Sequence, residues 1–183
     1  LDIHRLLHPV VSVRRDGEGG LTAILPDDAS GERRESMIYM EIERADARTR
    51  RAMTAELEAV LADVRAAVDD WPRAQIALRE DSQRLPDGEG AALLRWFGDR
   101  HFTLLGHRIE LAGGKQDGGI GILANRATQV LSDEARAAAI RHFETGGEAP
   151  AMLKSDRVAT VHRRVPLDLI VLPHRVDGKV AGL

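Results

Sequence analysis

The sequence predicts an α+β protein built from two small antiparallel-sheet domains with packed helices. In residues 35–44, apolar and polar side chains alternate, which is the period of a strand with one buried face. From Met53 to Trp71, apolar residues recur every three or four positions, as in an amphipathic helix lying on a sheet. After residue 90, helix-like and strand-like segments alternate again. These three observations together predict the α+β class.

The composition is that of an ordinary globular protein. Of its 183 residues, 43% are hydrophobic and only 3% aromatic, so cores must be built from Leu, Val, Ile and Ala. A formal net charge of −3 gives no reason to expect nucleic acid or an acidic membrane as a partner. The sequence has no Cys, which excludes disulfides and thiolate metal sites. We therefore expect a cytoplasmic protein.

The first half of the chain predicts three strands. β-Branched side chains in residues 6–16 favour the first strand, and the glycines of residues 16–20 permit a tight turn after it. Residues 21–25 return as the second strand of this hairpin. A polar loop over residues 26–34 then leads into the alternating strand 35–44.

A long helix is predicted after the third strand. It should begin near Ala47 and end at Trp71, because Pro72 disfavours a helical conformation at the residue before it. Proline is tolerated in a first turn, so weaker helix can continue from Pro72 to about Arg84. We expect one side of the strand and one side of the helix to form a core from Ile38, Met40, Ile42, Leu57, Leu61, Val64 and Val68.

Residues 85–90 are the best candidate for a domain boundary, because they hold two glycines and a proline between apolar segments. The predicted domains are therefore 1–84 and 85–183. The second domain is expected to contain, in order, a helix closed by Gly98, strands over 101–110 and 120–123, a helix after an N-cap at Ser132, and strands over 151–154, 158–162 and 167–172.

The two ends of the sequence predict a fragment of a longer protein. The first residue is Leu1 and not Met. Near the other end, Asp177-Gly178 predicts a tight hairpin turn, but the returning strand has little sequence left. We therefore expect the second domain to be truncated at its C-terminus.

Two patterns suggest phosphate or metal binding, and both have simpler interpretations. The glycines of residues 113–121 lack Gly-x-Gly-x-x-Gly spacing and precede no helix, so a hairpin turn is favoured over a phosphate loop. His4 and His8 are one helical turn apart, but no carboxylate completes a zinc-protease pattern beside them. We predict neither a metal nor a cofactor site in this chain.

The sequence also lacks a motif for nucleophilic catalysis. It contains no Gly-x-Ser-x-Gly and no Cys. Ser155 and Thr160 lie near His162 in the sequence, an arrangement that any β-sheet can produce. We therefore predict no catalytic residues.

A basic strip over residues 154–164 is the best candidate for ligand binding. Lys154, Arg157, Arg163 and Arg164 could form a clamp for an anion or a carboxylate. The alternative is a solvated turn and strand face. The sequence alone leaves both interpretations open, because a clamp requires side chains that converge in space.

Six segments together resemble the N-terminal region of the large bacterial NAD-specific glutamate dehydrogenases. The resemblance keeps its order along nearly the whole chain and rests on residues 7–16 (LHPVVSVRRD), 35–44 (ESMIYMEIER), 60–71 (VLADVRAAVDDW), 94–108 (LRWFGDRHFTLLGHR), 119–123 (GIGIL) and 154–163 (KSDRVATVHR). It implies a much longer parent that oxidises L-glutamate to 2-oxoglutarate and ammonia with NAD, while the catalytic part lies elsewhere.

The resemblance also implies domain types and partners. Residues 1–84 would be an ACT-like domain without its first strand and helix, and residues 85–183 a PAS-like or second ACT-like domain. The chain would then act in regulation or assembly, with the rest of the parent chain, including its catalytic domain, as partner. Two hypotheses follow: an amino-acid effector binds to a sensing module, or the chain is a structural scaffold for a homo-oligomer without a ligand.

Overall fold

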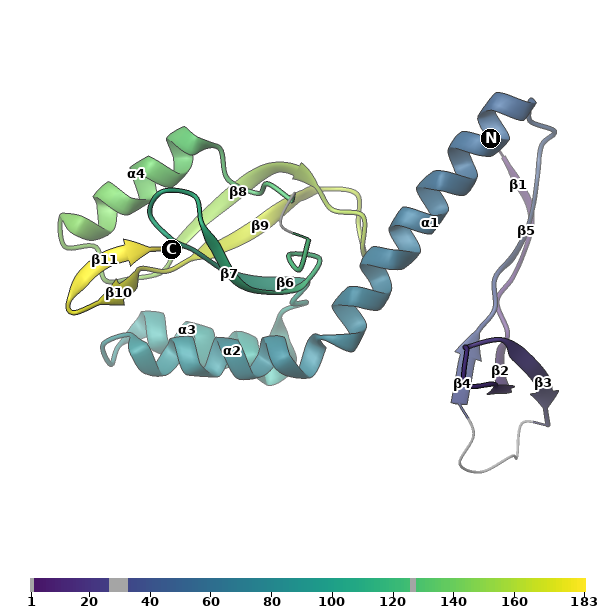
Figure 1. Ribbon diagram of the computed structural model, residues 1–183, viewed down its shortest axis with the longest axis horizontal. Helices are drawn as coiled ribbons and strands as arrows, with labels where there is room; N and C mark the ends of the chain where they lie inside the picture. Colours follow the sequence, from purple (N-terminus) through teal and green to yellow (C-terminus); the bar gives the residue numbers. More distant parts are fainter. Residues whose placement is uncertain (1, 27–32, 126–127) are drawn as a thin grey trace. The chain divides into compact units, whose positions relative to one another are not determined.

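The computed structural model describes residues 2–26, 33–125 and 128–183, and these form two compact units, Leu1–Met53 and Thr54–Leu183 (Figure 1). The division therefore lies at residue 53, whereas the sequence suggested residue 84. The reason is that the helical residues up to 84 pack on the second unit. Small antiparallel sheets with packed helices are present in the structure, so the α+β class is confirmed.

The first unit contains two small antiparallel sheets. Its strands are β1 (Ile3–Leu7), β2 (Val10–Arg15), β3 (Leu21–Leu25), β4 (Arg33–Ser36) and β5 (Tyr39–Ile42). One sheet has the order β3-β2-β4, and the other pairs β1 with β5. The predicted hairpin of β2 and β3 is confirmed. Its turn is closed by the Asp16 carboxylate, which accepts from the amide of Gly20 at 2.7 Å. Most of the predicted loop 26–34 lies outside the described residues.

The predicted single strand over residues 35–44 is wrong. The chain leaves one sheet at the end of β4 and enters the other at the start of β5, so Met37 and Ile38 lie between two sheets. The expected core is wrong as well, because Ile38 is 56% exposed and Val68 is 65% exposed. Met40, Leu57 and Leu61 are also exposed. Alternating apolar and polar residues indicate one buried face only if the whole segment belongs to a single sheet.

The two long helices lie close to their predicted limits. Helix α1 (Ala47–Asp69) begins in the first unit and continues into the second, and α2 (Trp71–Arg84) follows after a break at Asp70. Pro72 lies in the first turn of α2, where its missing amide hydrogen leaves no helical bond unmade. The predicted start near Ala47 and the continuation to about Arg84 are confirmed. The first helix, however, ends at Asp69 and not at Trp71, which is the first residue of α2.

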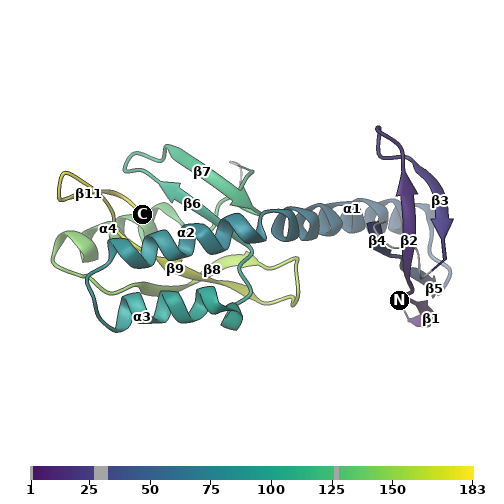
Figure 2. The ribbon, with the colours of Figure 1, turned by 90° about the horizontal axis from the view of Figure 1, so that it is seen from below.

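The second unit combines antiparallel strands with helices on both sides (Figures 1 and 2). After α2 come α3 (Glu89–Trp96), β6 (Gly106–Glu110), β7 (Gln116–Gly121), α4 (Asp133–Glu144), β8 (Ala151–Val158), β9 (Pro166–Val171), β10 (His174–Val176) and β11 (Lys179–Gly182). The strands pair as β6-β7, β8-β9 and β10-β11. A bridge between Leu111 and Gly182 connects the end of β6 to β11.

Some caps and turns of the second unit form where the local sequence predicts them, and others do not. Ser132 caps α4 by accepting from the amide of Ala135 at 3.1 Å, as predicted, and Asp177-Gly178 forms the predicted hairpin turn. Gly98, however, does not end its helix, which continues as a π-type turn until Arg100 adopts a left-handed φ of 68°. Residues 158–162 are not a separate strand, because β8 ends at Val158 and His162 is left-handed with φ 69°.

The core of the second unit has a layer on each side of the strands. Helices α2 and α3 pack on one side through a cluster of Ala74, Leu78, Leu94, Phe97, Leu104 and Ile120. On the other side, α4 packs through Ala139 and Phe143 against Leu131 and Val171. Strand β9 contributes Ile170 to the first layer and Val171 to the second, because successive side chains of a strand point to opposite faces.

Asp70 connects the start of α2 to the end of β7. Its carboxylate accepts from the amide of Gly121 at 2.7 Å and from the Arg73 guanidinium at 2.7 Å. Chiefly because of the bond from Gly121, the pKa of Asp70 is lower than its ordinary value. A folded-state pKa below the unfolded one contributes stability above the unfolded pKa, and this contribution is lost as the pH falls through the folded pKa.

We therefore expect Asp70→Asn to lower the free energy of unfolding at neutral pH. This deficit relative to the unsubstituted chain should shrink as the pH falls through the folded pKa of Asp70, because the native carboxyl then also loses its charge. Urea unfolding measured at a series of pH values tests this. Asp69→Asn is the matched control, since the Asp69 side chain is exposed. A deficit that does not change with pH would contradict the electrostatic explanation.

Candidate functional site

The second unit contains a cavity of about 1050 Å³ between β6 and β9, with one side of α2 as a further wall. This volume lies at the upper end of the range typical of small-molecule sites. Most of its lining is apolar, from residues such as Leu78, Ile122 and Leu167. Polar and charged side chains also line this cavity, and two groups of them are joined by hydrogen bonds and ion pairs.

The first polar group joins α2 to β6. The carboxylate of Asp81 lies 2.9 Å from Nε2 of His107 and also accepts from Arg84 at 2.8 Å. The Asp81 side chain is 12% exposed, so its charge is stabilised more by these two partners than by water. The His107 ring is thereby fixed in orientation in the wall of the large cavity.

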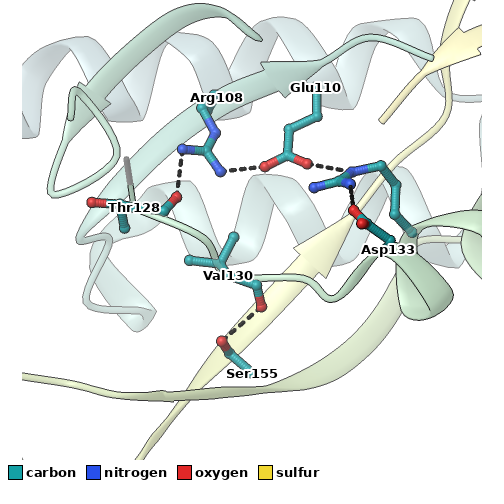
Figure 3. A network of polar contacts seen from close by, with 7 residues as sticks. Arg108, Glu110, Thr128, Val130, Asp133 and Ser155 are labelled. Carbon is teal, nitrogen blue, oxygen red and sulfur yellow. Dashed lines mark hydrogen bonds and ion pairs between the residues drawn. The ribbon is translucent and has the colours of Figure 1, made fainter. Parts of the chain in front are cut away.

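The second polar group is a buried ion network (Figure 3). Glu110 accepts from Arg108 and, at 2.7 Å, from Nε of Arg136, while Arg136 also donates to Asp133 at 2.7 Å. The Arg108 and Glu110 side chains are 2% and 7% exposed. Burial lowers the pKa of Arg136, but its bonds to Glu110 and Asp133 outweigh this, so the pKa is raised overall. The network connects β6 to the first turn of α4.

A further nitrogen of Arg108 reaches the loop between β7 and α4. Nη1 donates to the backbone oxygen of Thr128 at 2.8 Å. Two residues further on, the oxygen of Val130 accepts from the hydroxyl of Ser155 at 2.7 Å (Figure 3). This loop is therefore bound on one side to β6 and on the other to β8.

The predicted basic strip does not form one cluster of cations. Lys154 pairs with Asp168, Arg157 lies 4.0 Å from Asp63, and Arg164 lies 3.3 Å from Glu56. Arg163 is exposed and contributes to the lining of the large cavity. Three of the four predicted ligand-binding residues thus have carboxylate partners within the protein, and Arg163 is the one placed at the cavity. A clamp made by these residues stays a prediction.

The other candidate residues have structural roles in the described part of the chain. Thr160 donates to Asp63, and His8 contacts the hydroxyl of Ser36. Residues 113–121 form the turn and second strand of the β6–β7 hairpin, which confirms that interpretation. Over the described ranges, no three His, Asp or Glu side chains gather as metal ligands. None of the helices described is both long and apolar enough to cross a membrane.

The network around Arg108 was not predicted from the sequence. A signal was present, because Arg108 and Glu110 are two apart in a predicted strand and therefore lie on the same face. Opposite charges on the face of a strand that also carries core residues indicate a buried pair. The third member, Arg136, had no such signal, since it lies 26 residues further along the chain.

Comparisons with known proteins give two matches. The family model described as "Glutamate dehydrogenase, ACT1 domain" matches residues 1–57. The NAD-specific glutamate dehydrogenase of Pseudomonas aeruginosa is 30% identical over 200 aligned positions, which cover 97% of this chain and 12% of that protein. The chain thus spans about an eighth of the length of this relative. No solved structure matches significantly. Both matches agree with the resemblance seen in the sequence: the chain is similar to an N-terminal region of NAD-specific glutamate dehydrogenase, and residues 1–57 match the ACT1 domain of that enzyme.

Proposed function

We propose that this chain is a non-catalytic regulatory region of a large NAD-specific glutamate dehydrogenase. The observation that carries the proposal is the ACT1 match over residues 1–57, which nearly coincide with the compact unit Leu1–Met53. The parent protein would oxidise L-glutamate to 2-oxoglutarate and ammonia with NAD as its cofactor, in the cytoplasm. The partner of this region would be the rest of the parent chain, including the catalytic domain.

In this proposal the second unit is the sensing module, of a PAS-like or ACT-like type. The large cavity supports this assignment, because apolar walls with a few fixed polar groups are typical of ligand sites. The ligand would be an amino acid that contacts Arg163 through its carboxylate. Lys154, Arg157 and Arg164 could join the contact only by leaving Asp168, Asp63 and Glu56.

Calorimetry of the purified chain with glutamate, aspartate and other amino acids tests the sensing role. We expect saturable heat at millimolar concentrations or below, and a weakening of about tenfold in Arg163→Gln, which corresponds to the loss of one charged hydrogen bond. Arg95→Gln, an exposed arginine of α3, is the matched control and should bind normally. Absence of both heat and thermal stabilisation with every amino acid would overturn the sensing role.

A specific observation favours assembly as a second candidate function. Among the described residues of the first unit only Ser12 and Val13 are buried. Large apolar side chains are instead at least 40% exposed there, namely Ile3, Leu6, Leu7, Val10, Leu21, Ile24, Met37, Ile38, Tyr39 and Met40. So many exposed apolar side chains are typical of an interaction surface.

The scaffold alternative assigns this surface to a second copy of the chain. Sedimentation equilibrium should then show a dimer or larger oligomer, and Ile24→Lys, which places a charge at a 60% exposed apolar position, should shift it to the monomer. A strict monomer over a wide concentration range would overturn this alternative. The calorimetry above is independent of this measurement, so sensing and assembly can be accepted or rejected separately.

A further inference from the structure

A second cavity of about 260 Å³ lies in the β6–β7 hairpin. It is lined by Arg108 from β6 and, on the returning strand and the turn after it, by Gln116, Asp117, Gly118, Gly119, Leu123 and Ala124. Arg108 and Leu123 also contribute to the large cavity, whereas the other residues do not. The small cavity therefore adjoins the large one at Arg108 and Leu123, and Gln116 and Asp117 line the small one alone.

The cavity lies at an irregularity in the strand pairing. His107 pairs with Ile120 and Ile109 with Asp117, so three steps along β7 oppose two steps along β6. Such a bulge locally disrupts the ladder and redirects side chains. The opposing residues Gly118 and Gly119 are required, because Gly118 has φ +63° and a Cβ on Gly119 would lie 2.4 Å from the oxygen of Leu123. Opposite Arg108, one wall of the cavity is therefore bare backbone.

Two buried polar atoms point to what the small cavity would bind. Within the described part of the chain, Nε of Arg108 and Oε1 of Gln116 are buried without a hydrogen-bond partner. The two residues both line the small cavity, and one atom is a donor while the other is an acceptor. Leaving such buried groups unpaired is unfavourable, because they lose their hydrogen bonds to water. A ligand that pairs with both atoms therefore gains binding energy that the folded chain lacks.

The charges around the cavity determine the chemistry of that ligand. The positive charge of Arg108 is already balanced by Glu110, and Asp117 adds a further carboxylate to the wall. A simple anion such as phosphate would meet one free donor and a net negative surrounding. A ligand must instead bring an acceptor for Nε of Arg108 and a donor for Oε1 of Gln116, and the surrounding carboxylates favour a donor with a positive charge. The size of the cavity restricts it to a molecule smaller than usual drug-sized ligands.

We propose that the small cavity binds a free α-amino acid with a small side chain, as a zwitterion. Its carboxylate accepts from Nε of Arg108, and its ammonium group donates to Oε1 of Gln116. Binding of an amino acid at the small cavity would extend the proposed sensing role, and only its physiological meaning rests on that role. The two sites are tested through different residues, Arg163 for the large cavity and Gln116 for the small one, so either can fail alone.

NMR titration of the purified chain with glycine, L-alanine and L-serine tests the proposal. We expect saturable shifts at the amides of Gly118 and Gly119 and at the Nε–H of Arg108. Acetate, which has only the carboxylate, and methylamine, which has only the ammonium group, should each bind about tenfold more weakly or worse, because each pairs with one atom alone.

Two variants separate binding from folding. Gln116→Met removes the acceptor and should weaken glycine binding by about tenfold. Asp117→Asn removes an exposed negative charge beside the cavity and should weaken glycine binding by a smaller factor. Gln83→Met, at an exposed position of α2, is the matched control and should bind like the unsubstituted chain. Phosphate or acetate binding as tightly as glycine would overturn the proposal, as would saturable binding unaffected in either variant. The absence of any saturable shift would also overturn the proposal, and would indicate that Nε of Arg108 and Oε1 of Gln116 bind water instead.

Discussion

Glu110→Gln is expected to lower the free energy of unfolding of the second unit by about 3 to 5 kcal/mol, the usual effect of removing one partner from a buried ion network. Glu110 is the central carboxylate between two guanidinium groups, and its side chain is only 7% exposed. Neutralising it leaves Arg108 buried without a counter-charge. Arg136 keeps Asp133 as a partner, but Asp133 is itself largely exposed and screened by water.

Denaturant unfolding followed by tryptophan fluorescence measures this effect, because both tryptophans, Trp71 and Trp96, belong to the second unit. Glu58→Gln, on the exposed side of α1, is the matched control and should change stability by no more than about 0.5 kcal/mol. Replacing Arg108 and Glu110 together by Leu should recover part of the loss, since no unpaired charge then remains at Arg108. A loss in Glu110→Gln no larger than that of the control would contradict the network as described.

Leu94→Ala is expected to destabilise the second unit by about 2 to 5 kcal/mol. Leu94 is 0% exposed and lies in α3, where it packs with Phe97, Leu78 and Ile120. Shortening its side chain leaves a void between α3 and the strands, and neighbouring side chains can fill it only in part. The same denaturant experiment measures the change.

Leu57→Ala is the matched control for this substitution. Leu57 is 45% exposed on α1, so the same change in size should affect stability by less than about 1 kcal/mol. If both variants lose the same amount, the described packing of α3 is wrong. If Leu57→Ala loses more than Leu94→Ala, the predicted core around Leu57 has to be reconsidered.

The bulge at the small cavity also explains why a glycine-rich segment occurs in a β-hairpin. The four glycines between residues 113 and 119 have two tasks in the structure. Gly113 and Gly114 adopt positive φ in the turn itself, while Gly118 and Gly119 form the bulge opposite Arg108. The role of Gly113 and Gly114 in the turn could be predicted from the sequence, because glycines are typical of tight turns. The role of Gly118 and Gly119 could not, because it depends on their pairing opposite Arg108 of the neighbouring strand.

Much of the local structure could be predicted from the residues alone. The limits of α1 and α2, the Ser132 cap and the hairpin turns at residues 16–20 and 177–178 all follow from proline, glycine or capping side chains. These signals act within a few residues, so no knowledge of distant segments is needed. The family resemblance was likewise visible in the order of six segments, and the comparisons agree with it.

The candidate site was predicted only in part. Arg163 was identified from a cluster of cations along the sequence, and it does line the large cavity. The carboxylates that pair with Lys154 and Arg164 lie elsewhere in the chain, Asp168 across a strand pair and Glu56 on α1. A run of like charges in the sequence cannot show which opposite charges will meet it after folding.

The sequence by itself therefore determined the class of the fold, the ends of most helices and turns, and the resemblance to NAD-specific glutamate dehydrogenases. Only the tertiary structure decided that the strand after Ser36 changes sheets, that Asp70 binds Gly121, and that Arg108 and Gln116 meet at one cavity. The physical reason is the same in each case. Caps, turns and periodicity are satisfied by neighbours in sequence, whereas strand pairing and the partners of buried charges depend on segments that approach one another only when the chain folds.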